Sequence, residues 1–377
     1  APDPAGGMLK ESFEIGDKIG EGTFGVVHEC WHRADAKKQV HAVKYIDKAA
    51  QDLSSILTET AMMRKLNHPN VVRCLGVFNE PDHMCIVMEH WIGQDMVSRL
   101  VNITEAGREL SEEAVAGLLH QMLAAVAYLH SRDIVHRDVK LDNFLLDRPE
   151  IEASGVRVAL ADFGCAAYLR AGERLQESVG TKLYKAPEIF MEDYGHVVDT
   201  WAIGVCLHAL LAGDLPFTNE RAVLQMRPPF PIGLSGPCFD LLKRLLSKND
   251  AKRPSAAEAM EHPFMGIRPK PEPSVKVDNA GEVDQAPQPA GVVVRKKSSK
   301  VSSVSEVASR PRSPRSLRRL KGVQFAAAAP KAVQPGDCAS SSTSATASFE
   351  TPRSPALPAP LASPASPASP ASLASSG

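Results

Sequence analysis

Apolar and polar positions alternate over short stretches near the start of this chain, which is the two-residue period of a β-strand. We expect strands over residues 15–19, 26–31 and 41–46, and the continuous apolar run over 84–88 predicts a buried strand. Helical spacing of apolar residues predicts helices over 53–66 and 111–131, and the second begins with Ser-Glu-Glu, a helix-start signal. An apolar run over 156–161 predicts a further strand. The glycine-rich and polar motifs of the chain lie at the ends of these elements.

The composition changes near Arg268. Before it, apolar runs alternate with charged turns, whereas the rest is Pro, Ala, Ser and Val with almost no aromatic residues. Such a segment cannot bury enough surface to offset its ordering entropy, so we expect residues 268–377 to be mostly disordered. The sequence therefore predicts an extension over 1–12, a folded domain over 13–264 and a Pro/Ser/Ala-rich tail over 265–377.

A formal net charge of −1 hides two regions of opposite sign. Residues 1–267 carry 28 Lys and Arg against 37 Asp and Glu, while residues 291–321 carry ten basic residues and one acid, Glu306. An acidic body with a basic segment suggests that the tail approaches the body, or that the body favours basic peptides. Two independently solvated surfaces are the alternative.

The seven cysteines contain no C-x-x-C pair and lie mostly among apolar neighbours, which is typical of a reducing compartment. We therefore expect a cytoplasmic location, with the nucleus left open. No apolar run approaches the ~20 residues of a membrane span, and the start has no basic-then-apolar signal. The sequence begins without a methionine, so it starts within a longer protein or Met8 is the true first residue.

The motif Gly20-x-Gly22-x-x-Gly25-x-Val27 joins the first two expected strands. A βαβ dinucleotide-binding fold uses a similar pattern, but it needs a helix directly after the glycines, and residues 26–30 are strand-like. Glycines at these positions let the backbone approach phosphate oxygens closely. The nucleotide contacts expected here are Ile19, Gly20, Glu21, Gly22, Thr23, Phe24, Gly25 and Val27.

Lys44, on the third expected strand, has the spacing of a lysine that reaches the α- and β-phosphates, with a surface lysine as the alternative. Its ammonium needs a carboxylate, for which Glu59 is the candidate unless that residue is simply solvated. The backbone of Glu89 and Trp91 is expected to meet the adenine edge. Asp95 is placed to reach a ribose hydroxyl or a peptide arginine, and is equally suited to cap a helix.

The segment 134–143 holds a carboxylate, a lysine two residues later and an amide five residues later. We expect Asp138 to accept the proton of an attacking hydroxyl, Lys140 to balance the moving negative charge and Asn143 to bind metal. Asp162, in Asp162-Phe163-Gly164, offers a second oxygen ligand for Mg²⁺. ATP and Mg²⁺ are the expected cofactors.

Together with Ala186-Pro187-Glu188, these motifs make residues 13–264 resemble a eukaryotic protein kinase domain. The segment from Asp199 to Gly204 resembles the buried helix that anchors the catalytic loop, and His262-Pro263-Phe264 the usual end of the domain. Arg253 matches the arginine that pairs with Glu188. The resemblance implies an α+β, bilobal fold, with a small mostly-β lobe (13–88), a hinge and larger helical lobe (89–264), and ATP between the lobes. It also places Ala42 and Leu145 among the nucleotide contacts.

Lys140 makes the chain similar to serine/threonine kinases, and residues 143–146 with 161–167 resemble the calcium/calmodulin-dependent and calcium-dependent group. The resemblance places Asp142 at the position where related enzymes carry a carboxylate that faces arginines of the substrate. With Asp95 and the acidic body, this predicts protein substrates with Arg or Lys N-terminal to the target hydroxyl. Glu177 stands where many relatives carry a phosphorylated threonine, and it either pairs with Arg137 or points to water.

Three departures from the family pattern stand out. Lys182 replaces the usual proline and Lys185 the usual apolar residue, so the preference just after the target hydroxyl is open. Residues 147–154 form an insertion that we expect to be a surface loop. The interval 217–240 is shortened and proline-rich, which predicts a truncated helix.

In the tail, residues 317–325 are basic with spaced apolar residues and resemble a calmodulin-binding segment. Membrane-surface or nucleic-acid contact and plain basic disorder are the alternatives, and titration with calcium-loaded calmodulin distinguishes them. We expect no nucleic-acid partner. For the whole chain, the main hypothesis is an active protein kinase; an inactive scaffold of the same fold is the rival, and a small-molecule phosphotransferase is disfavoured by Ala186-Pro187-Glu188.

Overall fold

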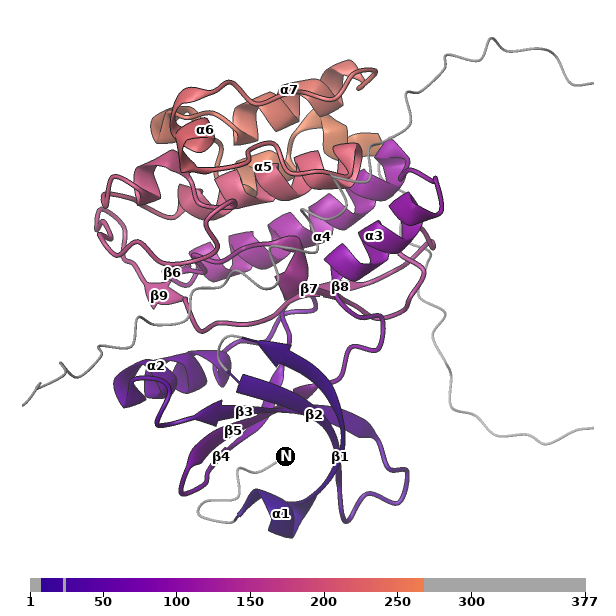
Figure 1. The fold of residues 1–377 in the computed structure, drawn as a ribbon, viewed down its shortest axis with the longest axis vertical. Helices are drawn as coiled ribbons and strands as arrows, with labels where there is room; N and C mark the ends of the chain where they lie inside the picture. Colours follow the sequence, from indigo (N-terminus) through magenta and orange to yellow (C-terminus); the bar gives the residue numbers. More distant parts are fainter. Residues whose placement is uncertain (1–7, 23–24, 268–377) are drawn as a thin grey trace, which may run out of the picture. The chain divides into compact units, whose positions relative to one another are not determined.

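The computed structural model describes residues 8–22 and 25–267. The N-terminal part is an antiparallel sheet of five strands in the order β1-β2-β3-β5-β4, with helix α2 beside it (Figure 1). Its elements are α1 (Leu9–Ser12), β1 (Phe13–Gly22), β2 (Gly25–His32), β3 (Val40–Asp47), α2 (Leu53–Met63), β4 (Cys74–Asn79) and β5 (His83–Glu89). All four expected strands are present, and the expected helix ends at Met63, short of residue 66.

The two faces of this sheet bury different residues because successive side chains of a strand point to opposite sides. On β5, Cys85 and Val87 pack with Leu9 and Phe78 in a small core that α1 covers. The alternate residues Met84, Ile86 and Met88 join the larger core, which continues into the helical part. The apolar run over 84–88 is therefore buried on both faces of the sheet, as the sequence predicted.

Gly25 shows why the turn between β1 and β2 needs glycine. Its φ is +143°, and an added Cβ would lie 1.8 Å from the carbonyl oxygen of Tyr45 on β3. No other residue fits this approach without moving the strand. Thr23 and Phe24, also expected to contact nucleotide, lie outside the described residues.

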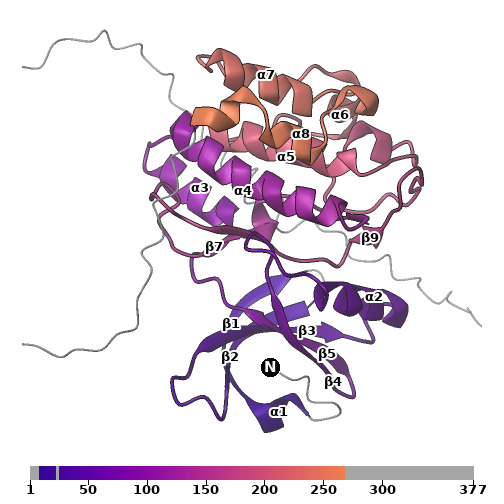
Figure 2. The same cartoon turned by 180° about the vertical axis from the view of Figure 1, so that it is seen from behind.

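The C-terminal part is mostly helical, with α4 packed against α5 and α8 (Figure 2). Its helices and strands are α3 (Met96–Glu105), α4 (Glu112–His130), β6 (Ile134–Val135), β7 (Phe144–Leu146), β8 (Val158–Leu160), β9 (Ala167–Tyr168), α5 (Val197–Ala212), α6 (Glu220–Gln225), α7 (Gly236–Leu245) and α8 (Ala256–Met260). Short 3₁₀ turns are η1 (Leu141–Asn143), η2 (Pro187–Ile189), η3 (Asp250–Lys252) and η4 (Pro263–Ile267).

Local sequence explains where the long helices lie. The hydroxyl of Ser111 accepts a hydrogen bond from Ala114 N, Glu112 and Glu113 occupy the first turn of α4, and one face of this helix is buried. Helix α5 is buried along nearly its whole length, as expected of a helix that is apolar all round.

The predicted α+β, bilobal architecture is confirmed, with a β-sheet lobe and a helical lobe. The two are joined by backbone hydrogen bonds as well as by the chain: Val72 N donates to Leu160 O at 2.9 Å, and Leu160 N to Asn70 O at 2.9 Å. The expected strand over 156–161 is shorter, covering Val158–Leu160. The insertion over 147–154 is a loop between β7 and β8, and the expected truncated helix is α6, with six residues.

Within the described residues, no helix is both long and apolar enough to cross a membrane. Three predictions for the tail concern residues outside the described part of the chain, so they stay predictions. They are the disorder over 268–377, the basic segment 291–321 and the calmodulin-binding segment 317–325.

Candidate active site

Lys44 links three elements at the centre of the candidate site. Its Nζ lies 3.0 Å from Glu59 Oε1, on α2, and 2.9 Å from Asp162 Oδ1, which follows β8. Lys44 and Glu59 are both buried, so the surface and solvated alternatives for these two residues are wrong. The expected ion pair is present, and it ties α2 to the sheet.

The charges of this trio support one another. Burial disfavours the ammonium of Lys44, but the nearby carboxylates of Asp162 and Glu59 outweigh it and raise the pKa of Lys44. Burial likewise opposes the carboxylate of Asp162, yet Lys44 holds the pKa of Asp162 below its usual value. Each group therefore stays charged because its partner is charged.

Asp199, at the start of α5, positions the loop that carries Asp138. Its carboxylate accepts hydrogen bonds from His136 N at 2.8 Å and Arg137 N at 2.9 Å, and lies 2.9 Å from His130 Nε2. Burial opposes its charge, but these hydrogen bonds dominate and lower the pKa of Asp199. A buried carboxylate that receives two backbone donors fixes the loop, as the resemblance of 199–204 to an anchoring helix implied.

Asp138 sits in a network of donors. Thr181 N donates to Asp138 Oδ1 at 2.7 Å, and Lys140 Nζ forms an ion pair with Asp138 Oδ2 at 2.9 Å. Asn143 Nδ2 donates to Asp138 O at 2.9 Å. The carboxylate, the lysine and the amide expected to converge are thus brought together within one loop.

Thr181 is a member of this network that the motifs did not reveal. Its hydroxyl lies 2.9 Å from Lys140 Nζ, so Thr181 contacts both Asp138 and Lys140. It reaches them because Gly180, with a φ of +88°, lies against the backbone of Arg137, where an added Cβ would be 2.2 Å from the Arg137 carbonyl oxygen. In the sequence, the only sign of this contact is that a glycine, Gly180, directly precedes Thr181.

Asn143 and Asp162 form a donor set that suits Mg²⁺. Because Asn143 Nδ2 is used in the bond to Asp138 O, its amide oxygen is the end available as a ligand. Asp162 contributes a carboxylate, and hard oxygen donors completed by phosphates and water are what this ion prefers. The residues present therefore fit the expected metal.

The residues expected to contact the nucleotide lie on β1, β2, β3, the end of β5, the hinge and β7. Ala42 pairs with Met88 and Val27 with Gly20 in the sheet, Trp91 is buried, and Ile19 is exposed. Glu89 ends β5, and Leu145 forms an isolated bridge with Asp95. Their contacts with nucleotide stay a prediction.

Asp95 is the N-cap of α3. Its carboxylate accepts from Ser98 N at 2.8 Å and from Ser98 Oγ at 2.6 Å. The structure therefore shows the capping alternative, while contact with ribose or a peptide arginine stays a prediction.

Glu177 pairs with Arg137, as expected, at 2.8 Å between Oε2 and Nη1. Tyr194 also holds Glu177 in place, because its hydroxyl donates a hydrogen bond to Glu177 O at 2.6 Å. Arg137 also donates through Nε to Cys165 O. Glu177 is 69% exposed, so the pair adds little to global stability, but it connects the segment before Gly180 to the catalytic loop.

Glu188 and Arg253 form a bidentate pair in the interior, with side chains only 7% and 0% exposed. Arg253 Nη2 lies 3.1 Å from Glu188 Oε2, and Nη1 also donates to Val197 O at 2.9 Å. The expected pair is present. It joins the end of the segment 177–188 to the start of α5 and to the turn before α8.

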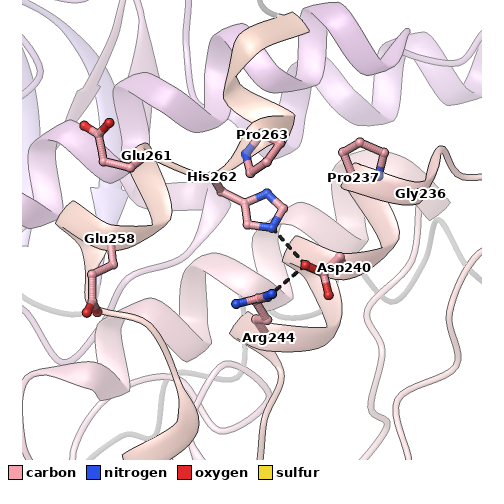
Figure 3. Close-up of a pocket in the computed structure, with 8 residues that line it drawn as sticks. All are labelled: Gly236, Pro237, Asp240, Arg244, Glu258, Glu261, His262 and Pro263. Carbon is pink, nitrogen blue, oxygen red and sulfur yellow. Dashed lines mark hydrogen bonds and ion pairs between the residues drawn. The ribbon is translucent and has the colours of Figure 1, made fainter.

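A separate pocket lies between α7 and α8, outside this site (Figure 3). Asp240 Oδ2 there accepts from Arg244 Nε at 2.8 Å and lies 3.1 Å from His262 Nε2. The polar groups at its centre are therefore already paired with one another.

The fold has two lobes. Lys44 pairs with Glu59 and Asp162, and Asn143 is bonded to the loop that carries Asp138. This combination defines a protein kinase domain. Residues 13–265 match the family model described as "Protein kinase domain", and the chain belongs to this family.

Curated relatives belong to the group that the sequence resembled. CDPK-related kinase 5 of Arabidopsis thaliana is 34% identical over 270 residues, covering 67% of this chain and 44% of the relative. Serine/threonine-protein kinase SIK1 of Mus musculus is 35% identical, with coverages of 68% and 33%. Calcium-dependent protein kinase 8 of Oryza sativa subsp. japonica is 32% identical, with coverages of 70% and 50%. The chain thus spans between a third and half of these relatives' lengths.

Proposed function

We propose that this protein is a serine/threonine protein kinase that transfers the γ-phosphoryl group of ATP to protein hydroxyls. The observation that carries the proposal is the complete set of charged contacts in one site, in which Lys44 bridges Glu59 and Asp162. The family and the printed names of its relatives support it. No observation favours the inactive scaffold.

In this mechanism, ATP with a divalent metal, typically Mg²⁺, supplies the phosphoryl group. Lys44, fixed by Glu59, orients the α- and β-phosphates. Asp138 orients the target hydroxyl and accepts its proton, and Lys140, 2.9 Å from Asp138, offsets the negative charge that moves. Asn143 and Asp162 would hold the metal through their side-chain oxygen atoms.

The direct test is transfer of labelled phosphate from ATP to an arrayed serine and threonine peptide library by the purified chain. Transfer to serine or threonine peptides is expected. A failure to label any peptide with Mg²⁺ or Mn²⁺ present would overturn the proposal.

We further propose a preference for Arg or Lys N-terminal to the target. Asp142 is partly buried, and its Oδ2 has no hydrogen-bond partner among the described residues. Burial raises the pKa of Asp142 to about 6, with Lys140 opposing that shift. A carboxylate in this condition gains from a guanidinium partner.

Asp142→Asn is expected to lower kcat/KM for arginine-containing peptides by about five- to tenfold, because one charge-assisted contact is lost. Matched peptides with alanine in place of the arginine should change less than about twofold. Asp95→Asn, which preserves the cap, shows whether Asp95 shares this role. An equal loss with both peptide sets would contradict the assignment.

The Arg137–Glu177 pair supports a second proposal, that activity needs no activating phosphate. Protein made without an upstream kinase and treated with phosphatase should keep its kcat within about twofold, because the fixed carboxylate stands in for the phosphate. Glu177→Gln should lower kcat/KM. A strict requirement for phosphate on Ser178 or Thr181 would contradict this.

Two finer points remain proposals. The relatives named calcium-dependent protein kinases are consistent with calcium or calmodulin regulation, for which residues 317–325 are the candidate segment. The six described cysteines are free thiols, which supports a cytoplasmic location.

A further inference from the structure

The segment that follows Gly180 contacts the proposed base through Thr181 and carries two lysines. Thr181 N touches the carboxylate of Asp138, and Lys182 and Lys185 come one and four residues later. The charge of Asp138 is among those that act on the Lys185 ammonium. A peptide whose hydroxyl sits at Asp138 therefore has to place a neighbouring residue near this segment.

The ammonium of Lys185 is held by neutral groups. Its Nζ donates to Ser178 O at 3.0 Å and to Ser178 Oγ at 3.3 Å, and it lies 5.9 Å from the centre of the Phe190 ring. Burial lowers the pKa of Lys185, so its surroundings disfavour the charge. Within residues 8–22 and 25–267, no carboxylate forms an ion pair with it, and an incoming carboxylate would stabilise the ammonium.

Lys182 differs from Lys185 in both its exposure and its ion pairing. Its side chain is 64% exposed, and its Nζ already forms an ion pair with Glu220 Oε2 at 3.2 Å. Solvent and the existing partner leave it little to gain from a peptide. Of the two lysines, Lys185 is therefore the one suited to recognise an acidic side chain.

The surroundings of Asp138 have an acidic and a basic side. On the first, the charge of Asp95 acts on the carboxyl of Asp142, where basic residues preceding the target are proposed to bind. The charged groups around Lys185 are instead Asp138, Lys182 and Glu220. With basic residues that precede the target bound on the acidic side, an extended peptide would direct the residues that follow the target toward Lys185.

We propose that Lys185 selects an aspartate or glutamate directly after the target serine or threonine. This inference rests on the proposed function, because it takes Asp138 as the position of the target hydroxyl. It follows from a partly buried ammonium that hydrogen-bonds to Ser178 and has no ion pair within the described residues.

The test uses peptides that are identical, upstream arginine included, except for Glu, Leu or Lys after the target serine. The wild-type kcat/KM should be about five- to tenfold higher for Glu than for Leu, and lowest for Lys. Lys185→Leu should abolish or reverse the Glu preference, and Lys185→Arg should retain it. In the matched control, Lys182→Leu, the Glu-to-Leu ratio should change less than about twofold.

A binding measurement separates this inference from the kinase proposal. The same peptides with alanine replacing the target serine are titrated by fluorescence anisotropy, and thermal unfolding confirms that each variant is folded. Tighter binding of the Glu peptide that depends on Lys185 supports the inference even if no phosphate is transferred, an outcome that defeats only the kinase assignment. Equal affinity for Glu and Leu, or the same gain when Glu precedes the target, would overturn it.

Discussion

Asp138→Asn is expected to lower kcat by about 10²- to 10⁴-fold, because the proton acceptor is lost while the shape of the side chain is kept. The amide oxygen can still accept the hydrogen bond from Thr181 N, now 2.7 Å from Asp138 Oδ1. The ion pair with Lys140 disappears with the charge. The fold should survive, so thermal unfolding should change little while phosphoryl transfer falls.

The matched control for this variant is Asp133→Asn. Asp133 lies in the turn before the same loop, is exposed and has a φ of +57°, a conformation that asparagine tolerates. The same chemical change there should alter kcat less than about twofold. If Asp138→Asn kept more than about a tenth of the wild-type kcat, Asp138 could not be the base.

Arg253→Met is expected to destabilise the domain by about 3–5 kcal/mol, because it leaves the carboxylate of Glu188 buried without its cation. Arg253 is fully buried and gives Glu188 two hydrogen bonds. For a domain of this size, the loss corresponds to a fall in Tm of about 10 °C. Thermal and urea unfolding of the purified chain provide the measurement.

The double variant Arg253→Met with Glu188→Gln shows how much of the loss comes from the unpaired charge of Glu188. Since the orphaned charge is then gone, the double variant should cost less than the sum of the two single changes by at least about 1 kcal/mol. The control is Arg244→Met, which breaks an exposed pair with Asp240 and should cost less than about 1 kcal/mol. A comparable cost for Arg253→Met and Arg244→Met would contradict the prediction.

Much of the site could be predicted because its groups are held at short, characteristic spacings. Asp138, Lys140 and Asn143 share one loop, so their convergence follows from local chain geometry. The strand over 84–88 was predicted from its continuous apolar run, and the structure buries its alternate residues on the two faces of the sheet. The ends of the helices were predicted less accurately than their positions. Helix α2 ends at Met63, three residues before the predicted end, because the last turn of a helix depends on capping and packing.

By itself, the sequence determined which groups are the candidates for the site: the glycine turn, Lys44, the loop from Asp138 to Asn143, and Asp162. Only the tertiary structure decided how distant groups meet. Lys44 and Asp162 are 118 residues apart, Thr181 joins Asp138 across 43, and Asp95 engages its carboxylate in a helix cap. These contacts have no period in the sequence, because they arise where separately folded elements pack and where backbone dihedrals aim a side chain. The position of Lys185, whose ammonium hydrogen-bonds to Ser178 but forms no ion pair within the described residues, became visible for the same reason.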